Sequence, residues 1–289
     1  MRETSFLENA GISACAAAIS KTSAAPIERI KLLLQNQNEI IKSGKIDKPF
    51  LGIIDCASRT YRHEGFLSFW RGNLTNVIRY FPTQGLNFAF KDKIKTVFRG
   101  GYWKDKSLAK NTLSGGFGGV ITNFFVYSLD FARTRLANDV KNQGTTRLYK
   151  GLTDVYLKTL KSNGIRGLYR GFSVSILTIF VYRGLYFGLY DTISPQANTE
   201  SFFQLFLIGW FSTISAGMSC YPMDTIRRRM MMNSGNKEKS PTGRQVFNYI
   251  IKNEGILSFF KGGSANIFRS VAGAGVLVGV DKIKQVYLV

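Results

Sequence analysis

Three copies of one charged motif supply the residue types needed for an ion-pair gate or for a pathway lined with charge. In the first copy, Pro26 is followed by Glu28 and Lys31, which are neighbours on one face of a helix. Lys21 lies two turns earlier on that face. The alternative is a set of permanent ion pairs that tie helices together. The acid and base of the other two copies are Asp130 with Arg133 and Asp224 with Arg227.

A second motif, an aromatic residue followed by a base and a glycine, recurs downstream of each charged motif. Each copy would lie where a helix begins, and the free backbone N–H groups at a helix start attract anions. The motif therefore predicts three anion sites, and ordinary helix caps are the alternative. The copies are Trp70-Arg71-Gly72, Tyr169-Arg170-Gly171 and Phe260-Lys261-Gly262.

The residue types needed for catalysis or metal binding are scarce. The chain has three cysteines, Cys15, Cys56 and Cys220, and one histidine, His63. Their number and spacing fit neither a disulfide framework nor a zinc site, so we interpret the cysteines as free thiols. The sequence contains no Walker loop and no nucleophilic triad. We therefore expect no enzymatic activity, no metal and no cofactor.

The composition limits the chain to two classes of partner. Of its 289 residues, 39 are Lys or Arg and 18 are Asp or Glu, which gives a net charge of +21, while 45% are apolar. Such a charge favours nucleic acid, or anionic membranes and solutes. The sequence has no helix-turn-helix spacing, zinc finger or RNP-like strand, so nucleic-acid binding is not expected. The first ten residues fit neither a secretory signal nor an Arg-rich transit peptide.

Six apolar stretches reach or approach membrane-spanning length, although the mean hydropathy is only −0.03. Residues 111–129 and 201–223 contain no charge. Three of the other four are each interrupted by one Arg, and a single charge in such a segment marks a solute pathway because it must face protein or water. We expect a helical bundle around an aqueous cavity. The four other stretches are residues 9–20, 73–90, 171–190 and 262–280.

The two motifs recur in phase, which indicates three repeats. The charged motif begins at residues 26, 128 and 222, so its spacings are 102 and 94 residues. Each repeat would contain a membrane helix, a short amphipathic helix and a second membrane helix, and the short helices would begin near Gly52, Gly151 and Gly243. We therefore predict an all-α fold in a single domain, residues 1–289, made of three repeats of about 1–100, 101–198 and 199–289.

This arrangement resembles the mitochondrial carrier family over essentially the whole chain. The resemblance implies six transmembrane helices plus three short amphipathic helices in a threefold pseudosymmetric bundle around a central cavity, in the mitochondrial inner membrane. It also implies a matrix gate, in which the acid of one odd-numbered helix pairs with the base of the next. The implied pairs are Glu28 with Arg133, Asp130 with Arg227, and Asp224 with Lys31.

The cytoplasmic gate of the family, an acid followed three residues later by a base near the end of each even-numbered helix, is incomplete here. Asp92 with Lys95 and Asp281 with Lys284 match the pattern. Asp191 is followed by Ser194, so one of the three ion pairs is missing. We expect this replacement to weaken the state that is closed to the cytoplasm.

The resemblance further implies that the aromatic–base–glycine motifs bind the phosphates of cardiolipin as a structural lipid in an anionic membrane. The functional unit would be a monomer, and association with respiratory or ATP-synthase complexes stays open. The implied cardiolipin contacts are Gly52, Arg71, Gly72, Gly151, Arg170, Gly171, Gly243, Lys261 and Gly262.

Within the family, the chain is most similar to the ADP/ATP carriers. The run Arg227-Arg228-Arg229-Met230-Met231-Met232 is the signature of that subfamily. The implied function is electrogenic antiport of ADP for ATP by alternating access. Two alternatives stay open: a carrier for another nucleotide or phosphorylated solute, and a largely structural carrier-like subunit of a larger assembly.

The subfamily resemblance also implies a set of solute contacts. Lys21, Arg79 and Arg269 would hold the phosphates, and Arg228 would join them lower in the cavity. Tyr182 would stack on the adenine. The other implied contacts near the adenine are Asn87, Thr178, Ile179 and Cys220, of which Thr178 replaces a glycine and Cys220 a serine of the family pattern.

Overall fold

The computed structural model describes residues 6–97, 107–141, 146–193, 202–234 and 241–268. These described residues form helices and turns and contain no strand, which confirms the predicted all-α class. The chain divides into two compact units. Unit 1 comprises residues 1–81, 129–162 and 261–289, and unit 2 comprises residues 82–128 and 163–260.

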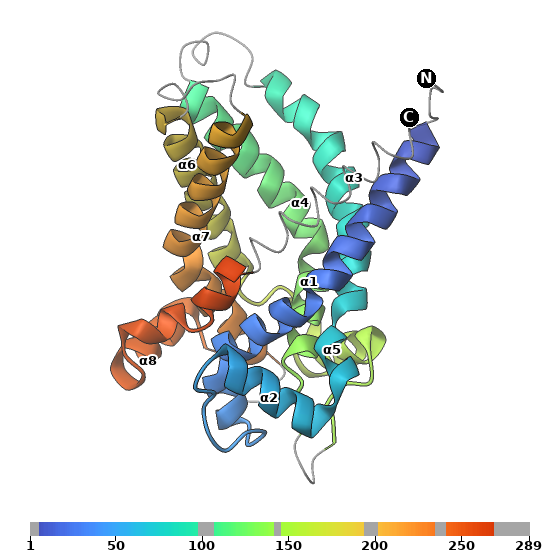
Figure 1. Ribbon diagram of the computed structural model, residues 1–289, viewed down its shortest axis with the longest axis vertical. Helices are drawn as coiled ribbons and strands as arrows, with labels where there is room; N and C mark the ends of the chain where they lie inside the picture. Colours follow the sequence, from blue (N-terminus) through green and yellow to red (C-terminus); the bar gives the residue numbers. More distant parts are fainter. Residues whose placement is uncertain (1–5, 98–106, 142–145, 194–201, 235–240, 269–289) are drawn as a thin grey trace. The chain divides into compact units, whose positions relative to one another are not determined.

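Unit 1 is organised around α1 (Phe6–Lys42), which contains Pro26 and therefore lacks one backbone donor in its interior. The short helix α2 (Ile53–Glu64) and the 3₁₀ turn η1 (Phe66–Trp70) pack against α1, and Figure 1 shows α2 near α1. The unit also contains the start of α3 (Asn73–Val97), the end of α4 (Ser107–Ala137) and the start of α5 (Leu152–Leu168).

Unit 2 is organised around α6 (Phe172–Ile193) and α7 (Phe202–Met232), which run side by side in Figure 1. The short helix α8 (Gly243–Asn253) and the turn η4 (Ile256–Phe260) pack on the end of α7. A capping box between Thr242 and Gln245 fixes the start of α8. The apolar face of α8 is buried in a cluster of Ile226, Met230, Val246, Ile250 and Phe259.

The predicted starts of the three short helices are confirmed. Helix α2 begins directly after Gly52, α5 begins directly after Gly151, and α8 begins at Gly243. In each predicted repeat one glycine with positive φ lies at the end of the short helix or, for Gly164, inside α5, and a second follows it in the chain; residues with a side chain rarely adopt this conformation. The same backbone conformation thus recurs at equivalent positions of the three predicted repeats. The pairs are Gly65 with Gly72, Gly164 with Gly171, and Gly255 with Gly262.

One helical segment among the described residues, Phe172–Tyr190 of α6, is long and apolar enough to cross a membrane. Only 6% of it is fully buried, and most of its other residues are partly exposed. The five other predicted spans do not reach that apolarity within the described part of the chain. A helix that exposes one face to lipid and another to a wet cavity carries polar residues, and its average hydropathy falls accordingly.

Candidate functional site

The first predicted matrix-gate pair lies within unit 1. Arg133 on α4 donates to a carboxylate oxygen of Glu28 on α1, and Asn76 on α3 donates to the same oxygen at 3.2 Å. Glu28 is only 8% exposed, so its charge depends on these donors, and removing one partner of such a pair costs about 3–5 kcal/mol. The other two predicted pairs join residues of different units and stay predictions: Asp130 with Arg227, and Asp224 with Lys31.

In unit 2, two bases of the Arg-Arg-Arg-Met-Met-Met run converge on one acid of the same helix. Arg227 donates to one oxygen of Asp224 at 3.1 Å, and Arg228 donates to the other at 2.9 Å. Arg227 also donates to the hydroxyl of Ser175 on α6 at 3.1 Å. The cluster contains one more base than acid and is largely shielded from solvent, so it is suited to attract an anion.

Arg79, a predicted phosphate ligand, lies beside an acid of the predicted gate. Its guanidinium is 4.0 Å from the carboxylate of Asp130 in unit 1. Arg79 is 28% exposed whereas Asp130 is 7% exposed, so a solute can reach the base more readily than the acid. Lys21 on α1, another predicted phosphate ligand, is also partly exposed. A phosphate group would compete with Asp130 for Arg79, because charge-assisted hydrogen bonds to either anion are strong.

An aromatic ladder runs along α6 from the residue predicted to stack on adenine. The rings of Tyr182 and Tyr186 are 6.3 Å apart with an angle of 9° between their planes, and those of Tyr186 and Tyr190 are 6.1 Å apart at 16°. The spacing of four residues places the three rings on one face of the helix. Tyr182 is partly exposed.

The residues that depart from the family pattern lie at the contact between α6 and α7. The Thr178 hydroxyl donates to the Val174 carbonyl at 2.7 Å, one turn earlier in its own helix. The Cys220 thiol donates to the Thr178 carbonyl at 3.9 Å. Ile179 packs against Gly119 on α4, where an added β-carbon would lie only 3.0 Å from the isoleucine. Thr178 and Cys220 thus contribute to helix packing in unit 2.

Two glycines of the aromatic–base–glycine motif allow close approach to the gate bases. A β-carbon on Gly72 would lie 3.3 Å from the carbonyl oxygen of Arg133, and one on Gly171 would lie 3.1 Å from that of Arg227. Both glycines have φ near +84°, so a side chain would be strained as well as crowded.

Two bases of this motif, Arg71 and Lys261, contact protein acceptors. Arg71 donates to Asp139 at 2.7 Å and to the Tyr149 carbonyl at 2.5 Å, and Lys261 donates to the side chain of Asn38 at 3.3 Å. A lipid phosphate near Arg71 would therefore depend more on backbone N–H groups than the resemblance implied.

An apolar cavity of about 990 Å³ lies next to Gly52 in unit 1. It is bounded by α1, by the start of α2 and by residues 264–268 directly after the third aromatic–base–glycine motif. Its volume is large enough for part of a lipid or another amphipathic molecule. The apolar lining includes Ile27, Ile30, Ile53 and Phe268.

Comparison with known proteins places these features in a family. A family model described as "Mitochondrial carrier protein" matches residues 2–102, 104–197 and 198–288. The chain belongs to the mitochondrial carrier family. The "ADP,ATP carrier protein" of Chlamydomonas reinhardtii is 54% identical over 99% of this chain and 96% of its own length. Mitochondrial ADP,ATP carrier proteins of Solanum tuberosum and Zea mays are 56% and 57% identical, over 98% and 94% of this chain and 75% and 72% of their own lengths.

This mitochondrial carrier contains two buried arginine–glutamate ties that sequence reasoning did not assign. Arg29 on α1 donates to both oxygens of Glu64 on α2, at 2.9 and 3.0 Å. Arg229 on α7 donates to both oxygens of Glu254, at 2.7 Å each. Both arginines are almost completely buried, so each tie fixes a long helix to the short helix of its own repeat. Glu64 and Glu254 each stand directly before a glycine with positive φ, Gly65 and Gly255, and this recurrence in the sequence was a visible signal for these ties.

The second repeat lacks this tie. Asn163 stands where the other repeats have Glu64 and Glu254. Arg135, which corresponds to Arg229 in the repeat, donates instead to the hydroxyl of Tyr149. Its guanidinium also lies 5.3 Å from the centre of that ring. The second repeat of the carrier is therefore held by a neutral partner where the first and third use a charged one.

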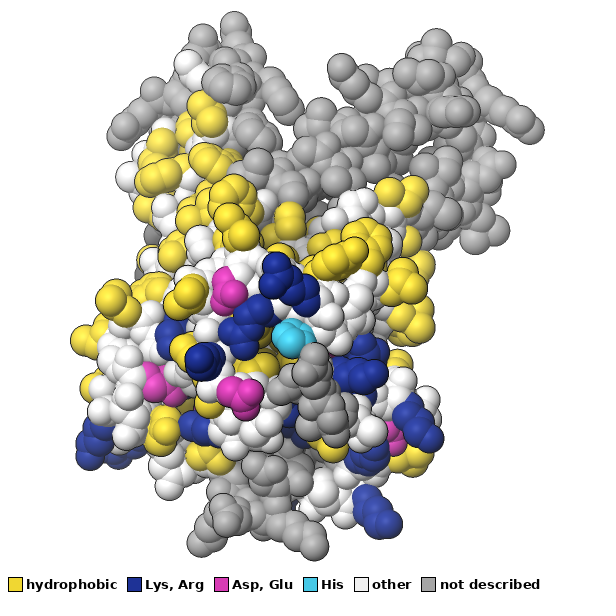
Figure 2. All heavy atoms as spheres, turned by 60° about the horizontal axis from the view of Figure 1, so that its bottom comes forward, with side chains coloured by type: hydrophobic (Ala, Val, Ile, Leu, Met, Phe, Trp, Pro, Cys, Tyr) yellow, Lys and Arg dark blue, Asp and Glu magenta, His cyan; other side chains and the backbone are white. Residues whose placement is uncertain are grey.

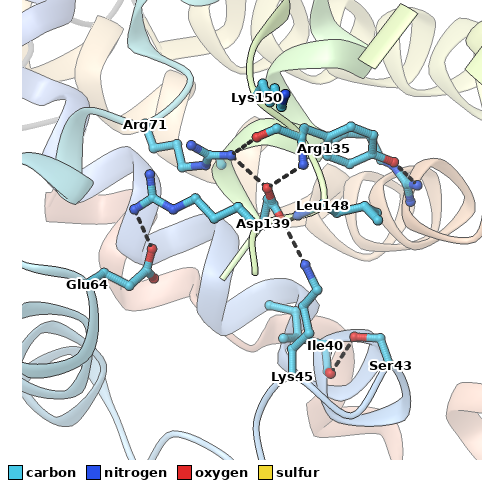
Figure 3. A network of polar contacts seen from close by, with 12 residues as sticks. Ile40, Ser43, Lys45, Glu64, Arg71, Arg135, Asp139, Leu148 and Lys150 are labelled. Atoms are coloured by element: carbon cyan, nitrogen blue, oxygen red, sulfur yellow. Dashed lines mark hydrogen bonds and ion pairs between the residues drawn. The ribbon is translucent and has the colours of Figure 1, made fainter. Parts of the chain in front are cut away.

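A buried carboxylate, Asp139, forms a polar centre in unit 1 that the sequence did not reveal (Figure 3). It accepts from Lys45 at 2.5 Å, from Arg71 at 2.7 Å, and from the backbone N–H groups of Leu148 and Tyr149 at 3.0 Å. Burial alone would raise the pKa of Asp139, but the hydrogen bonds from Lys45 and the two backbone groups lower it below its usual value. This centre fixes the chain after α4 to the start of α3.

The face shown in Figure 2 carries many more Lys and Arg than Asp and Glu side chains, and such a face attracts anions.

Several predicted site residues lie outside what the structure describes. The cytoplasmic gate belongs to the parts that are not described. Outside the described residues lie Ser194, Arg269, Asp281 and Lys284, and the side chains of Asn87, Asp92, Lys95 and Asp191 are likewise not described.

Proposed function

We propose that this carrier exchanges ADP for ATP across the mitochondrial inner membrane by alternating access. The observation that carries this proposal is the 54% identity to the "ADP,ATP carrier protein" of Chlamydomonas reinhardtii over almost the full length of both chains. No covalent bond is made or broken, so the protein acts as a transporter rather than an enzyme. The three consecutive matches to the family model support one carrier domain made of three repeats, with six membrane helices and three short helices.

The proposed solute site uses bases from several helices to hold the phosphate chain. Lys21 and Arg79 come from α1 and α3, and Arg228 comes from α7. Arg269 would supply a further contact. Several bases suit a multiply charged phosphate chain because each can make a charge-assisted hydrogen bond. Tyr182 would stack on the adenine, at one end of the aromatic ladder.

Two gates would alternate during exchange. The Glu28–Arg133 pair belongs to the proposed matrix gate, which opens when its ion pairs separate and the charges are rehydrated. The loss of attraction and the gain of hydration nearly balance in such pairs, so a bound solute can tip the equilibrium. ATP carries about one more negative charge than ADP, and a membrane potential supplies about 2.3 kcal/mol per charge per 100 mV. The exchange is therefore electrogenic.

The proposed lipid partner is cardiolipin, with the functional unit a monomer. The cavity beside Gly52 supplies an apolar wall, and a positive-φ glycine precedes α3 and α6, whose free backbone N–H groups at the helix start would attract a phosphate. An anionic lipid with several acyl chains fits both features. It is expected to act as a bound structural lipid rather than as a cofactor in the exchange.

Uptake of labelled ADP into liposomes that contain ATP and cardiolipin tests this function. We expect uptake that ADP and ATP inhibit, and that GTP and inorganic phosphate do not. Lys21→Ala should reduce uptake at least tenfold, since it removes one phosphate ligand. Normal uptake by Lys21→Ala would overturn the site assignment. Absence of uptake by folded wild-type protein would overturn the function.

A further inference from the structure

In the first two repeats, a buried polar residue lies one turn after the glycine of the aromatic–base–glycine motif, in α3 and in α6. Asn76 follows Gly72 by four residues, and Ser175 follows Gly171 by four residues. Both side chains are 2% exposed. Neither belongs to the charged motif or to the aromatic–base–glycine motif, and neither is among the predicted solute contacts.

Both residues touch an ion of the proposed matrix gate. The Asn76 amide donates to Glu28 at 3.2 Å, on the oxygen that also accepts from Arg133. The Ser175 hydroxyl accepts from Arg227 at 3.1 Å. Ser175 in turn accepts from the side chain of Asn123 on α4 at 3.0 Å, which fixes the position of its hydroxyl. Each contact is thus made with one ion of a predicted gate pair, an acid for Asn76 and a base for Ser175.

The backbone at the start of α3 and of α6 also contacts gate residues. Gly72 approaches the carbonyl of Arg133, and Gly171 approaches the carbonyl of Arg227, both within 3.4 Å of a β-carbon position. One turn of helix therefore contacts the main chain of a gate base through its glycine, and a gate side chain through the residue four positions later. A shift of α3 or α6 would therefore move the gate side chain that it contacts.

Asn76 is a poor choice for simple packing. Its amide oxygen is buried and has no hydrogen-bond partner, although its amide nitrogen binds Glu28. A buried acceptor without a partner destabilises the fold, and an apolar side chain of similar size would avoid that cost. The amide is useful at this position because it donates to the gate carboxylate.

We propose that Asn76 and Ser175 are positioning residues of the matrix gate, which orient the side chains of Glu28 and Arg227 for pairing. The proposal rests on the function given above. Asn266 follows Gly262 by four residues, and from this shared spacing we assign it to the third predicted pair, at Lys31. The three residues form one set, because each lies in the helix that directly follows an aromatic–base–glycine motif.

A double-mutant cycle distinguishes this role from packing. Asn76→Ala is made in the wild-type protein and in a Glu28→Gln/Arg133→Gln background, in which the ion pair is absent. Asn73→Ala is the matched control, because it removes the same side chain one turn earlier in α3 and its amide donates to Thr22 rather than to a gate ion. ADP/ATP exchange rates and melting temperatures are measured for every variant.

We expect Asn76→Ala to change the exchange rate about tenfold in the wild-type background, which corresponds to about 1.4 kcal/mol. In the background without the ion pair, the change should be less than about twofold. Equal effects in the two backgrounds, or no effect in the wild type, would overturn the proposal. Asn73→Ala should act equally in both.

The melting temperatures keep the test independent of transport. The decrease caused by Asn76→Ala should be larger with the ion pair than without it, even if no variant exchanges nucleotide. Failure of the wild-type exchange assay would refute the proposed function. Additive melting shifts of Asn76→Ala and the paired substitution would refute the positioning role.

Discussion

Replacing Glu254 by alanine isolates one structural feature, the buried tie between α7 and the third short helix. In the native protein Arg229 is completely buried and donates to both oxygens of Glu254, and Ser258 donates to one of them at 2.8 Å. The substitution leaves the guanidinium buried with no opposing charge at that site. The expected result is a lower free energy of unfolding.

The magnitude follows from the loss of one partner of a buried pair, which costs about 3–5 kcal/mol. For 289 residues, an unfolding entropy of about 2.1 cal/mol/K per residue gives ~0.6 kcal/mol/K, so the melting temperature should fall by about 5–8 °C. Replacing both partners by apolar residues, Arg229→Met with Glu254→Leu, should restore most of this loss, because no buried charge is left unpaired.

Thermal unfolding in mild detergent measures the effect, with a thiol-reactive dye that reports exposure of the buried cysteines Cys56 and Cys220. Asp154→Asn is the control: it breaks the exposed i,i+4 pair with Lys158 and should leave the melting temperature unchanged. The reasoning is refuted if Glu254→Ala melts within about 1 °C of wild type, or if the apolar double variant is less stable than Glu254→Ala.

Three further predictions follow from the described geometry and from the sequence. Burial raises the pKa of Cys56 to about 12, so iodoacetamide should not label this thiol at neutral pH in folded protein, and fast labelling far below the melting temperature would contradict this. Asp139→Asn should lower the melting temperature equally from about pH 5 to pH 8. The difference from wild type should narrow below about pH 4, because a carboxylate with a lowered folded pKa stabilises only while ionised; a constant difference down to pH 3 would argue against it. Ser194→Lys should slow ADP/ATP exchange by completing the cytoplasmic ion pairs, and unchanged kinetics would exclude a role for the missing base.

The local elements were predictable because their signals are local. Glycines at equivalent positions and the phase of two motifs fixed where the short helices begin. Apolarity alone does not mark all six predicted spans, because helices with a wet face carry polar residues. Among the described residues, Phe172–Tyr190 is the one segment that passes this criterion.

The polar ties were harder to predict, since they depend on contacts between distant parts of the chain. Arg29 is three residues after its motif proline and Arg229 is seven after its own, so the repeat alone does not align the two ties. Both positions lie on similar helix faces one turn apart, and only tertiary packing decides which base reaches the glutamate. Asp139 lies beyond the end of α4, where no periodic pattern marks a buried acid.

Counter-exchange across a sealed membrane tests the central claim most directly. Liposomes that contain cardiolipin and the wild-type protein are loaded with ATP or left empty, and labelled ADP uptake is followed with and without a membrane potential. The account predicts uptake only into ATP-loaded liposomes, faster when the interior is negative, because ATP leaves with about one more negative charge than ADP brings in. Uptake into empty liposomes at the same rate, or uptake that does not respond to the potential, would contradict it.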